Sequence, residues 1–238
     1  MPVHTNRLSA ALATTIASLT LVSGCDKQAH APASADVAGV PTFVAVAGEN
    51  IKVSMRYFTA NNLVGEPLDG YQANRCLLAA DAAKALQATA LVLAEQGFGL
   101  QLFDCYRPQR AVNHFVRWAS APEDQTTKRD FYPREEKSQL FERGYIAERS
   151  GHSRGATVDL TLYRLDTGGE VDMGTSFDFM DERSATEFPL EDETARENRL
   201  QLRAALEAQG FVNYSQEWWH YSYKPEPWPD TYFDVPVQ

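Results

Sequence analysis

The sequence predicts an α+β fold, with a central, mostly antiparallel sheet flanked by helices. Two observations lead to this prediction: Ala- and Leu-rich segments have the three- and four-residue spacing of helices, and short alternating segments have the period of strands. Helices interspersed with hairpin-like strands are typical of α+β proteins. The chain of 238 residues has the length of one well-buried domain, which we expect over residues 41–238.

Three segments have helical signals. Between residues 77 and 96 apolar side chains recur every three or four positions, and a glycine follows as a helix end. A second helix is expected over residues 108–118, because the fixed backbone of Pro108 suits a first helical turn. A third is expected over residues 194–209, with its leucines toward the core and Gly210 after it.

Strands are expected in four short segments. The most regular alternation of apolar and polar residues lies in the segment 156–163. There Val158, Leu160 and Leu162 alternate with polar residues, so that Asp159 must lie on the opposite, polar face of its strand. A long polar stretch, 121–149, is expected to be mostly loop with one short helix over 135–143. The expected strands are 99–103, 156–163, 211–214 and 218–223.

The first 24 residues have the features of an export signal. Arg7 precedes an apolar run over residues 8–22 that is too short to span a bilayer as a stable helix and ends in small residues. Residues 21–25, which extend one residue beyond this region, resemble the lipobox of bacterial lipoproteins, in which the cysteine is lipidated and becomes the mature N-terminus. The resemblance predicts lipidation of Cys25. The alternative is an ordinary secreted protein in which Cys25 falls there by chance.

Residues 25–40 are rich in Ala, Pro and Ser, cannot build a core, and predict a flexible tether. The domain would then be anchored by lipid at the periplasmic face of a bacterial membrane, and Asp26 resembles the signal for retention in the inner membrane. The formal charge of −10 makes nucleic acid a poor partner. A homodimer is a further expectation.

Two cysteines remain in the expected domain, Cys76 and Cys105. In an oxidising compartment a disulfide between them would stabilise the fold by about 3 kcal/mol through loop closure. The alternative is two unpaired thiols in the core.

A histidine, an aspartate and a second histidine form a candidate metal site. His152 lies in the loop before the strand that carries Asp159, so it can fold back over that carboxylate. Two histidines and a carboxylate can bind Zn²⁺ and leave a fourth position for water. Of the five histidines, His4 and His30 lie in the leader and tether, and His114 is interpreted as an ordinary, partly buried histidine of a helix. His220 is therefore the expected third ligand.

Glu217 lies three residues before His220 in a segment rich in aromatic residues. In a regular strand residues three apart face opposite ways, so the two share a site only if the chain turns or bulges between them. We predict that irregularity. The alternative interpretation is a solvated glutamate.

Several motifs together resemble a known family. The pattern Ser150-x-His152-x-x-Gly155-x-x-x-Asp159, followed by Glu217-x-x-His220, resembles the zinc D-alanyl-D-alanine peptidases of the hedgehog-like fold. Within these, residues 70–235 resemble the VanX-type D-Ala-D-Ala dipeptidases. The further motifs, in order, are NR at Asn74, YRP at Tyr106, SRG at Ser153, DLTLYRLDTG at Asp159, FDFMDERS at Phe177 and EWWHY at Glu217.

The resemblance implies one zinc ion bound by His152, Asp159 and His220. It also implies that Glu217 is the general base and that Arg107 stabilises the transition state. For the substrate, D-Ala-D-Ala, it implies an ammonium site at Asp178 and a carboxylate contact at Ser150. Taken alone, an arginine before a proline is commonly a surface residue, and Asp178 could simply cap a turn.

The sequence departs from the family pattern in three respects: Thr157 replaces an alanine, Cys76 and Cys105 replace apolar or glycine positions, and an export signal is present. Because familiar VanX-type enzymes act in the cytoplasm, an exported enzyme suggests salvage of D-Ala-D-Ala from wall turnover. Two alternatives are a zinc D,D-carboxypeptidase that acts on longer peptidoglycan peptides and a non-catalytic lipoprotein that binds zinc or wall fragments.

Overall fold

The computed structural model describes residues 41–238, together with the first two residues of the chain. The predictions for the leader, the tether and Cys25 lie outside the described residues, and the homodimer also stays a prediction. Among the described helices, none combines the length and the apolar character needed to cross a membrane.

The centre of the fold is a five-stranded sheet in the order β2-β4-β5-β7-β6. Strands β4, β5, β7 and β6 pair antiparallel, and only the edge strand β2 is parallel to its neighbour β4, so the predicted α+β architecture is confirmed. A separate two-stranded sheet pairs β1 with β3. The strands are β1 Phe43–Ala45, β2 Ile51–Val53, β3 Leu77–Ala79, β4 Phe98–Asp104, β5 Thr157–Arg164, β6 Phe211–Asn213 and β7 His220–Tyr223.

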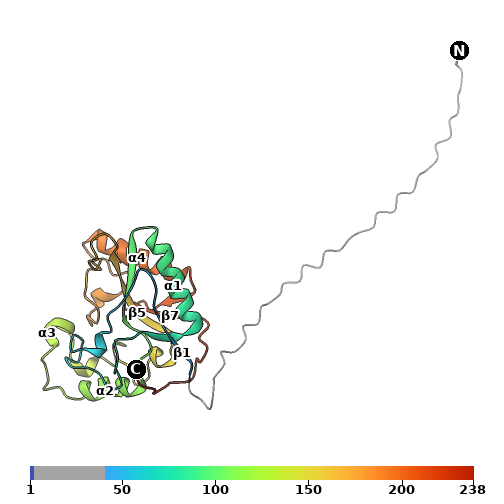
Figure 1. Ribbon diagram of the computed structural model, residues 1–238. Helices are drawn as coiled ribbons and strands as arrows, with labels where there is room; N and C mark the ends of the chain where they lie inside the picture. The colour runs from blue at the N-terminus through green and yellow to red at the C-terminus, as the bar shows by residue number, and fades with distance from the viewer. Residues whose placement is uncertain (3–40) are drawn as a thin grey trace. The chain divides into compact units, whose positions relative to one another are not determined.

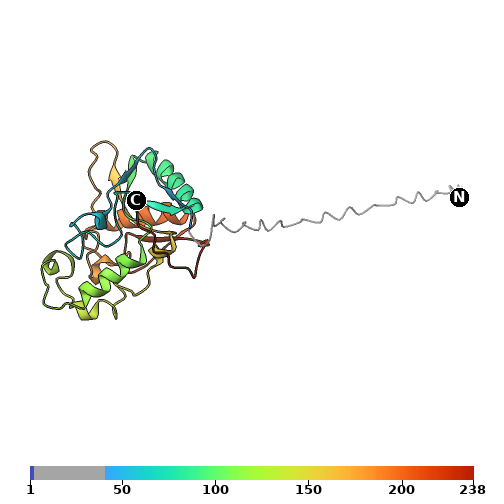
Figure 2. The ribbon, with the colours of Figure 1, turned by 60° about the horizontal axis from the view of Figure 1, so that its bottom comes forward.

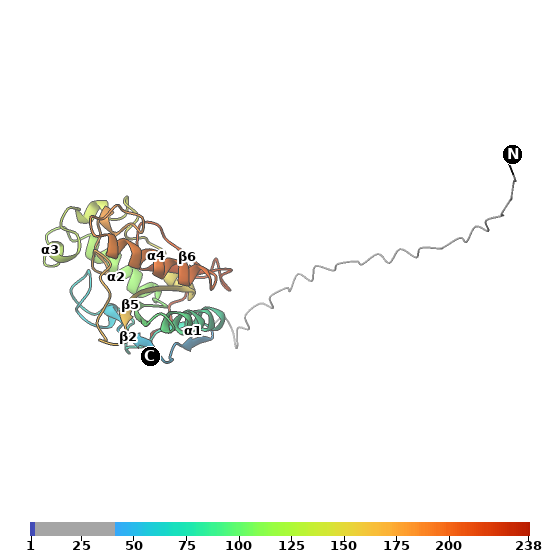
Figure 3. The ribbon, with the colours of Figure 1, turned by 90° about the horizontal axis from the view of Figure 1, so that it is seen from above.

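Helices α1 and α4 pack against each other and against the sheet, α1 on β4 and α4 on β5 and β6 (Figures 1 and 3). Figure 2 shows α2 apart from α1 and α4. The α-helices of the described residues are α1 Ala80–Ala94, α2 Gln109–Ala119, α3 Lys128–Phe131 and α4 Glu193–Glu207.

Side chains alternate along β5, so one face of this strand packs in the core and the other face carries polar residues. Val158, Leu160 and Leu162 are fully buried in the core, as the pattern predicts. Asp159 and Thr161 lie on the other, polar face, as predicted, and are also almost fully buried. Polar side chains on this face must therefore find partners inside the protein.

The first helix is shorter than predicted. The spacing places its start at residue 77, but Leu77–Ala79 form β3 and the helix begins at Ala80. The backbone of these three residues pairs with β1, and the carbonyl of Leu77 accepts a hydrogen bond from the N–H of Tyr106. Apolar spacing alone cannot separate a buried strand from the first turn of a buried helix.

The prediction of a short helix over residues 135–143 is also wrong. Only a 3-10 turn, Lys137–Gln139, lies there, and the helical turn of this region is α3. The Lys137 side chain points inward, where its ammonium donates to the backbone carbonyls of Trp118 and Ala121. A buried lysine that satisfies loop carbonyls fixes an irregular backbone, and a pattern of charged residues does not reveal it.

Two long-range links hold the turn between β4 and α2. Cys76 and Cys105 are joined by a disulfide, which ties this turn to the start of β3. From the other side, the C-terminal segment contacts it: the N–H of Gln109 donates to the carbonyl of Phe233, whose own N–H donates to Ser153. The turn that carries Arg107 is therefore fixed both to the start of β3 and to the C-terminal segment.

Removal of the disulfide should destabilise the domain without unfolding it. For Cys76→Ala with Cys105→Ala we expect a free energy of unfolding about 3 kcal/mol lower. This corresponds to a Tm about 6 to 12 °C lower for a domain of this size. Calorimetry of the variant against oxidised and fully reduced wild-type protein measures this effect, and equal Tm values for all three samples would contradict it.

Candidate active site

Three neighbouring strands place acidic and imidazole side chains in one row across the sheet. In the register of β4, β5 and β7, Asp104 lies opposite Asp159, and Asp159 lies opposite His220. Directly opposed residues of antiparallel strands present their side chains on the same face. A bulge in β4 between Leu102 and Asp104 brings Asp104 into this row.

His152 reaches the row from the 3-10 helix Gly151–Arg154, which precedes β5. Gly155 ends this helix with a φ of 79°, and a Cβ there would lie 2.1 Å from the Phe43 ring, so glycine is required. The Nδ1 atom of His152 lies 2.7 Å from the carbonyl oxygen of Cys105. Because a carbonyl only accepts, Nδ1 carries the proton and Nε2 of the neutral ring presents a lone pair.

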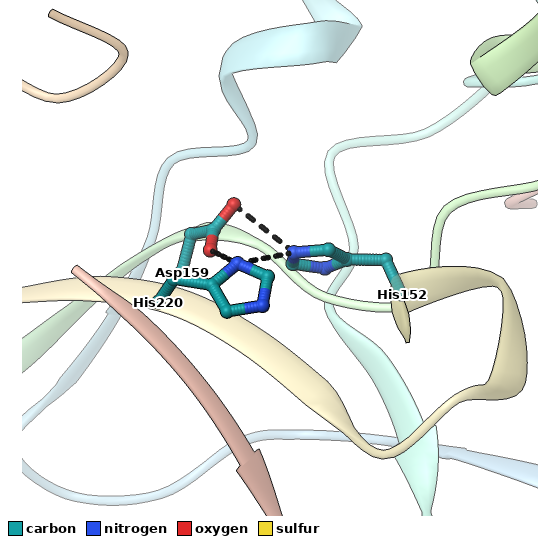
Figure 4. A group of neighbouring side chains, drawn as sticks. All are labelled: His152, Asp159 and His220. Carbon is teal, nitrogen blue, oxygen red and sulfur yellow. Dashed lines mark hydrogen bonds and ion pairs between the residues drawn. The ribbon is translucent and has the colours of Figure 1, made fainter. Parts of the chain in front are cut away.

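The candidate ligand atoms converge at one point (Figure 4). His152 Nε2 lies 3.3 Å from His220 Nδ1 and 3.3 Å from an Asp159 carboxylate oxygen, and the other oxygen of Asp159 lies 3.0 Å from His220 Nδ1. Ligand atoms bound at about 2.0–2.1 Å to a tetrahedral ion are about 3.3 Å apart. The three side chains therefore form a His–Asp–His set that can hold a divalent metal ion.

The predicted irregularity before His220 is confirmed. A turn covers Glu217 to Trp219, in which the N–H of His220 donates to the carbonyl of Glu217, and β7 begins only at His220. The turn brings a Glu217 carboxylate oxygen within 3.6 Å of His220 Nδ1. Burial, and then the charge of Asp159, raise the pKa of Glu217 to about 8, so the site contains a carboxyl group poised to exchange protons near neutral pH.

Arg107 lies inside the site, and the alternative of a surface arginine is wrong. Its side chain is only 12% exposed, and its guanidinium lies 2.9 Å from Asp104 and 3.6 Å from Asp159. Burial alone would lower the pKa of Arg107, but the Asp104 carboxylate and neighbouring groups raise it above its ordinary value. A permanently charged donor is thus fixed beside the ligand set.

Asp104 itself is a site residue that sequence reasoning missed. Its carboxylate is fully buried, accepts from Arg107 and from the hydroxyl of Tyr71, and lies 3.3 Å from Nδ1 of His152. The sequence does show an acid at the end of an expected strand, three residues before Arg107. It does not show the bulge that turns this acid toward the site.

Asp178 is buried, and its carboxylate pairs with a tyrosine hydroxyl instead of capping a turn. Its backbone has a φ of 59°, and its two carboxylate oxygens accept from the hydroxyl of Tyr57, at 3.0 and 2.9 Å. Burial, and then the charge of Asp159, raise the pKa of Asp178 well above its ordinary value. Such a carboxylate favours a cationic partner. Sequence reasoning missed Tyr57, which lies far from every motif.

These groups share one cavity of about 260 Å³. Ser150 lines it, and its hydroxyl accepts from the N–H of His152, which leaves the hydroxyl proton free to be donated. Apolar walls come from Leu63, Phe115 and Met180. His114 lies outside the lining and contacts Glu66 instead, in agreement with its interpretation as an ordinary helix residue.

A His–Asp–His set that can hold a metal ion, beside a buried glutamate and a buried arginine, has the composition of a metallopeptidase site. The comparisons with known proteins specify the family: a family model described as "D-ala-D-ala dipeptidase" matches residues 38–238. The chain belongs to this family.

Curated relatives cover most of the chain. It is 45% identical over 197 residues to a D-alanyl-D-alanine dipeptidase of Enterococcus faecium, a match that spans 83% of the chain and 98% of the relative. It is 46% identical over 187 residues to one from Enterococcus faecalis and 47% identical over 194 residues to one from Streptomyces coelicolor. Each of these two matches spans 79% of the chain and 93% of the relative.

Asp104→Asn should weaken metal binding, because the neutral amide cannot hold Arg107 by charge and removes the negative charge that lies 3.3 Å from Nδ1 of His152. Loss of such outer partners costs about 10- to 100-fold in metal affinity or activity. Competition with a chromogenic chelator measures the affinity, and Asp130→Asn, at an exposed acid, is the matched control. Unchanged affinity in Asp104→Asn would contradict this role.

Proposed function

We propose that this protein is a zinc-dependent dipeptidase that hydrolyses D-Ala-D-Ala to two molecules of D-Ala. The observation that carries the proposal is the convergence of His152 Nε2, His220 Nδ1 and Asp159 within 4.8 Å of one another, beside Glu217. The names of the relatives support the same substrate.

Zinc suits the donor set better than a hard cation such as Mg²⁺, which prefers six oxygen ligands. His152, Asp159 and His220 would hold the ion in three positions, and the His152 tautomer already presents a free lone pair to it. When bound, zinc would lower the pKa of a coordinated water and polarise the scissile carbonyl.

The acid–base work falls to Glu217. Its buried carboxylate takes a proton from the attacking water and delivers it to the leaving amine of the second D-Ala. Once it has taken the proton, Glu217 is the acid that donates to the leaving amine, and burial, which raises the pKa of this carboxyl, favours the protonated form.

The developing oxyanion needs a fixed donor, which Arg107 supplies. Asp104 and Asp159 hold the guanidinium from two sides, so it does not have to reorganise during the reaction. Preorganised donors of this kind contribute about 3 to 4 kcal/mol to transition-state stabilisation in other enzymes.

The free ammonium of the substrate would bind at Asp178. Its buried carboxylate gains a cationic partner there, and the Tyr57 hydroxyl fixes its orientation. Ser150 would donate to the substrate at the opposite, carboxylate end. A cavity with sites for both charged ends favours a dipeptide over a longer chain.

We also propose that the enzyme is exported as a lipoprotein anchored through Cys25, with the inner membrane as its location. In the periplasm it would meet D-Ala-D-Ala released by wall turnover, which suggests salvage of D-Ala as its role. The apolar leader, the lipobox-like residues 21–25 and the Ala- and Pro-rich residues 25–40 support this part.

The central test is hydrolysis of D-Ala-D-Ala by the purified full-length protein. We expect activity to be lost with a chelator and restored by Zn²⁺, and kcat to fall about 10²- to 10⁴-fold in Glu217→Gln, because the general base is gone. Release of D-Ala, measured by an amino-acid oxidase assay, reports both effects. Activity that survives both treatments would refute the mechanism.

The same assay separates the alternatives. N-acetyl-D-Ala-D-Ala has no ammonium for Asp178, so its kcat/KM should be at least about tenfold lower than that of the free dipeptide. Equal hydrolysis of the acetylated or longer substrates would favour a D,D-carboxypeptidase. Zinc binding without any turnover would favour a non-catalytic binding protein.

The anchor is tested by Cys25→Ala. We expect the wild-type protein to be labelled by radioactive palmitate and to sediment with membranes, and the variant to lose both properties because no thiol remains for lipidation. Fractionation of cells that express each form measures this. Equal membrane association of the two forms would show that Cys25 is not the anchor.

A further inference from the structure

The carboxylate end of the substrate needs a partner in the cavity. The charged side chains that line it are Asp159, Asp178, Glu217, Arg107 and Arg149. In the proposed function, Asp178 meets the ammonium of the dipeptide and the metal site meets the scissile carbonyl. The carboxylate loses water on binding and needs a cation of its own to offset that loss.

Arg107 already has carboxylate partners within the protein. Its guanidinium lies 2.9 Å from Asp104 and 3.6 Å from Asp159, and its side chain is buried. A second carboxylate at this guanidinium would have to compete with Asp104. Arg107 therefore suits an oxyanion that forms briefly better than a carboxylate that stays bound throughout.

Arg149, by contrast with Arg107, has no carboxylate partner among the described residues. It is exposed, and among the described residues no carboxylate lies within ion-pair distance of it. The centre of the Tyr232 ring lies 5.2 Å from its guanidinium carbon. This stacking restrains the side chain without neutralising its charge, so the hydrogen-bond donors stay available.

The position of Arg149 fits a carboxylate contact. It lines the active-site cavity and also the neighbouring surface pocket, which places it at their common boundary. It directly precedes Ser150, whose hydroxyl can donate into the cavity. Asp178 and Tyr57, which would bind the ammonium, come from other segments of the chain.

We propose that Arg149 binds the terminal carboxylate of the dipeptide beside Ser150, and that it thereby makes a free C-terminus a requirement of the substrate. The proposal deepens the proposed function, on which it rests. Arg149 is assigned to substrate binding, not to the chemical step, so its removal should change KM and leave kcat nearly unchanged.

The first experiment compares D-Ala-D-Ala with its C-terminal amide, D-Ala-D-Ala-NH₂, in the full-length, zinc-loaded enzyme. In Arg149→Gln we expect KM for the free dipeptide to rise about tenfold, with kcat within about twofold of wild type, since an exposed charge-assisted contact is of this strength. The preference for the acid over the amide should fall by about the same factor.

Two matched variants complete the series. Arg149→Lys keeps the charge but not the paired donors, so it should recover part of the preference. Arg196→Gln removes the same charge from α4, outside the cavity lining, and should leave both KM values unchanged. An unaltered preference in Arg149→Gln, or an equal loss in Arg196→Gln, would overturn the proposal.

A binding measurement separates this inference from the proposed function. Calorimetric titration of D-Ala-D-Ala into Glu217→Gln, with and without Arg149→Gln, reports affinity in the absence of turnover. A roughly tenfold weaker Kd in the double variant supports the role of Arg149 even if wild-type turnover is undetectable. An unchanged Kd overturns the inference, and it does so even when wild-type enzyme cleaves the dipeptide.

Discussion

The hydrogen bond between His152 Nδ1 and the carbonyl of Cys105 is the contact on which the site depends. It fixes the ring tautomer, so that the lone pair of Nε2 points toward His220 and Asp159. The carbonyl can do this only because the turn between β4 and α2 is held in place by the disulfide, by β3 and by the C-terminal segment. The disulfide, β3 and the C-terminal segment thus all help to orient the imidazole of His152.

The second organising constraint is an excess of buried negative charge. Asp104, Asp159, Asp178 and Glu217 are all buried on the same side of the sheet, and Arg107 is the guanidinium placed among them. Burial, together with repulsion from Asp159, disfavours the charged forms of Glu217 and Asp178 and raises their pKa values. A bound dication and a substrate ammonium would each reduce this repulsion, so the excess of buried negative charge favours the binding of cations.

Sequence reasoning predicted the residues whose placement follows from local pattern. Alternation places Asp159 opposite the core residues of β5, and the three-residue spacing of Glu217 and His220 requires the turn that the structure contains. It could not find Asp104, because a bulge decides which way that residue faces, or Tyr57, which meets Asp178 from 121 positions away. Features that depend on register or on long-range pairing carry no local signature.

The late place of β7 in the sequence, together with its interior place in the sheet, has a consequence for truncated chains. The strand that carries His220 lies between β5 and β6, and the segment after it locks the turn before α2. A chain that ends before this strand has His152 and Asp159 but lacks His220, and so lacks one of the three candidate metal ligands. It also lacks the segment that fixes the turn before α2, so the ligand set and its support both depend on the C-terminal part of the chain.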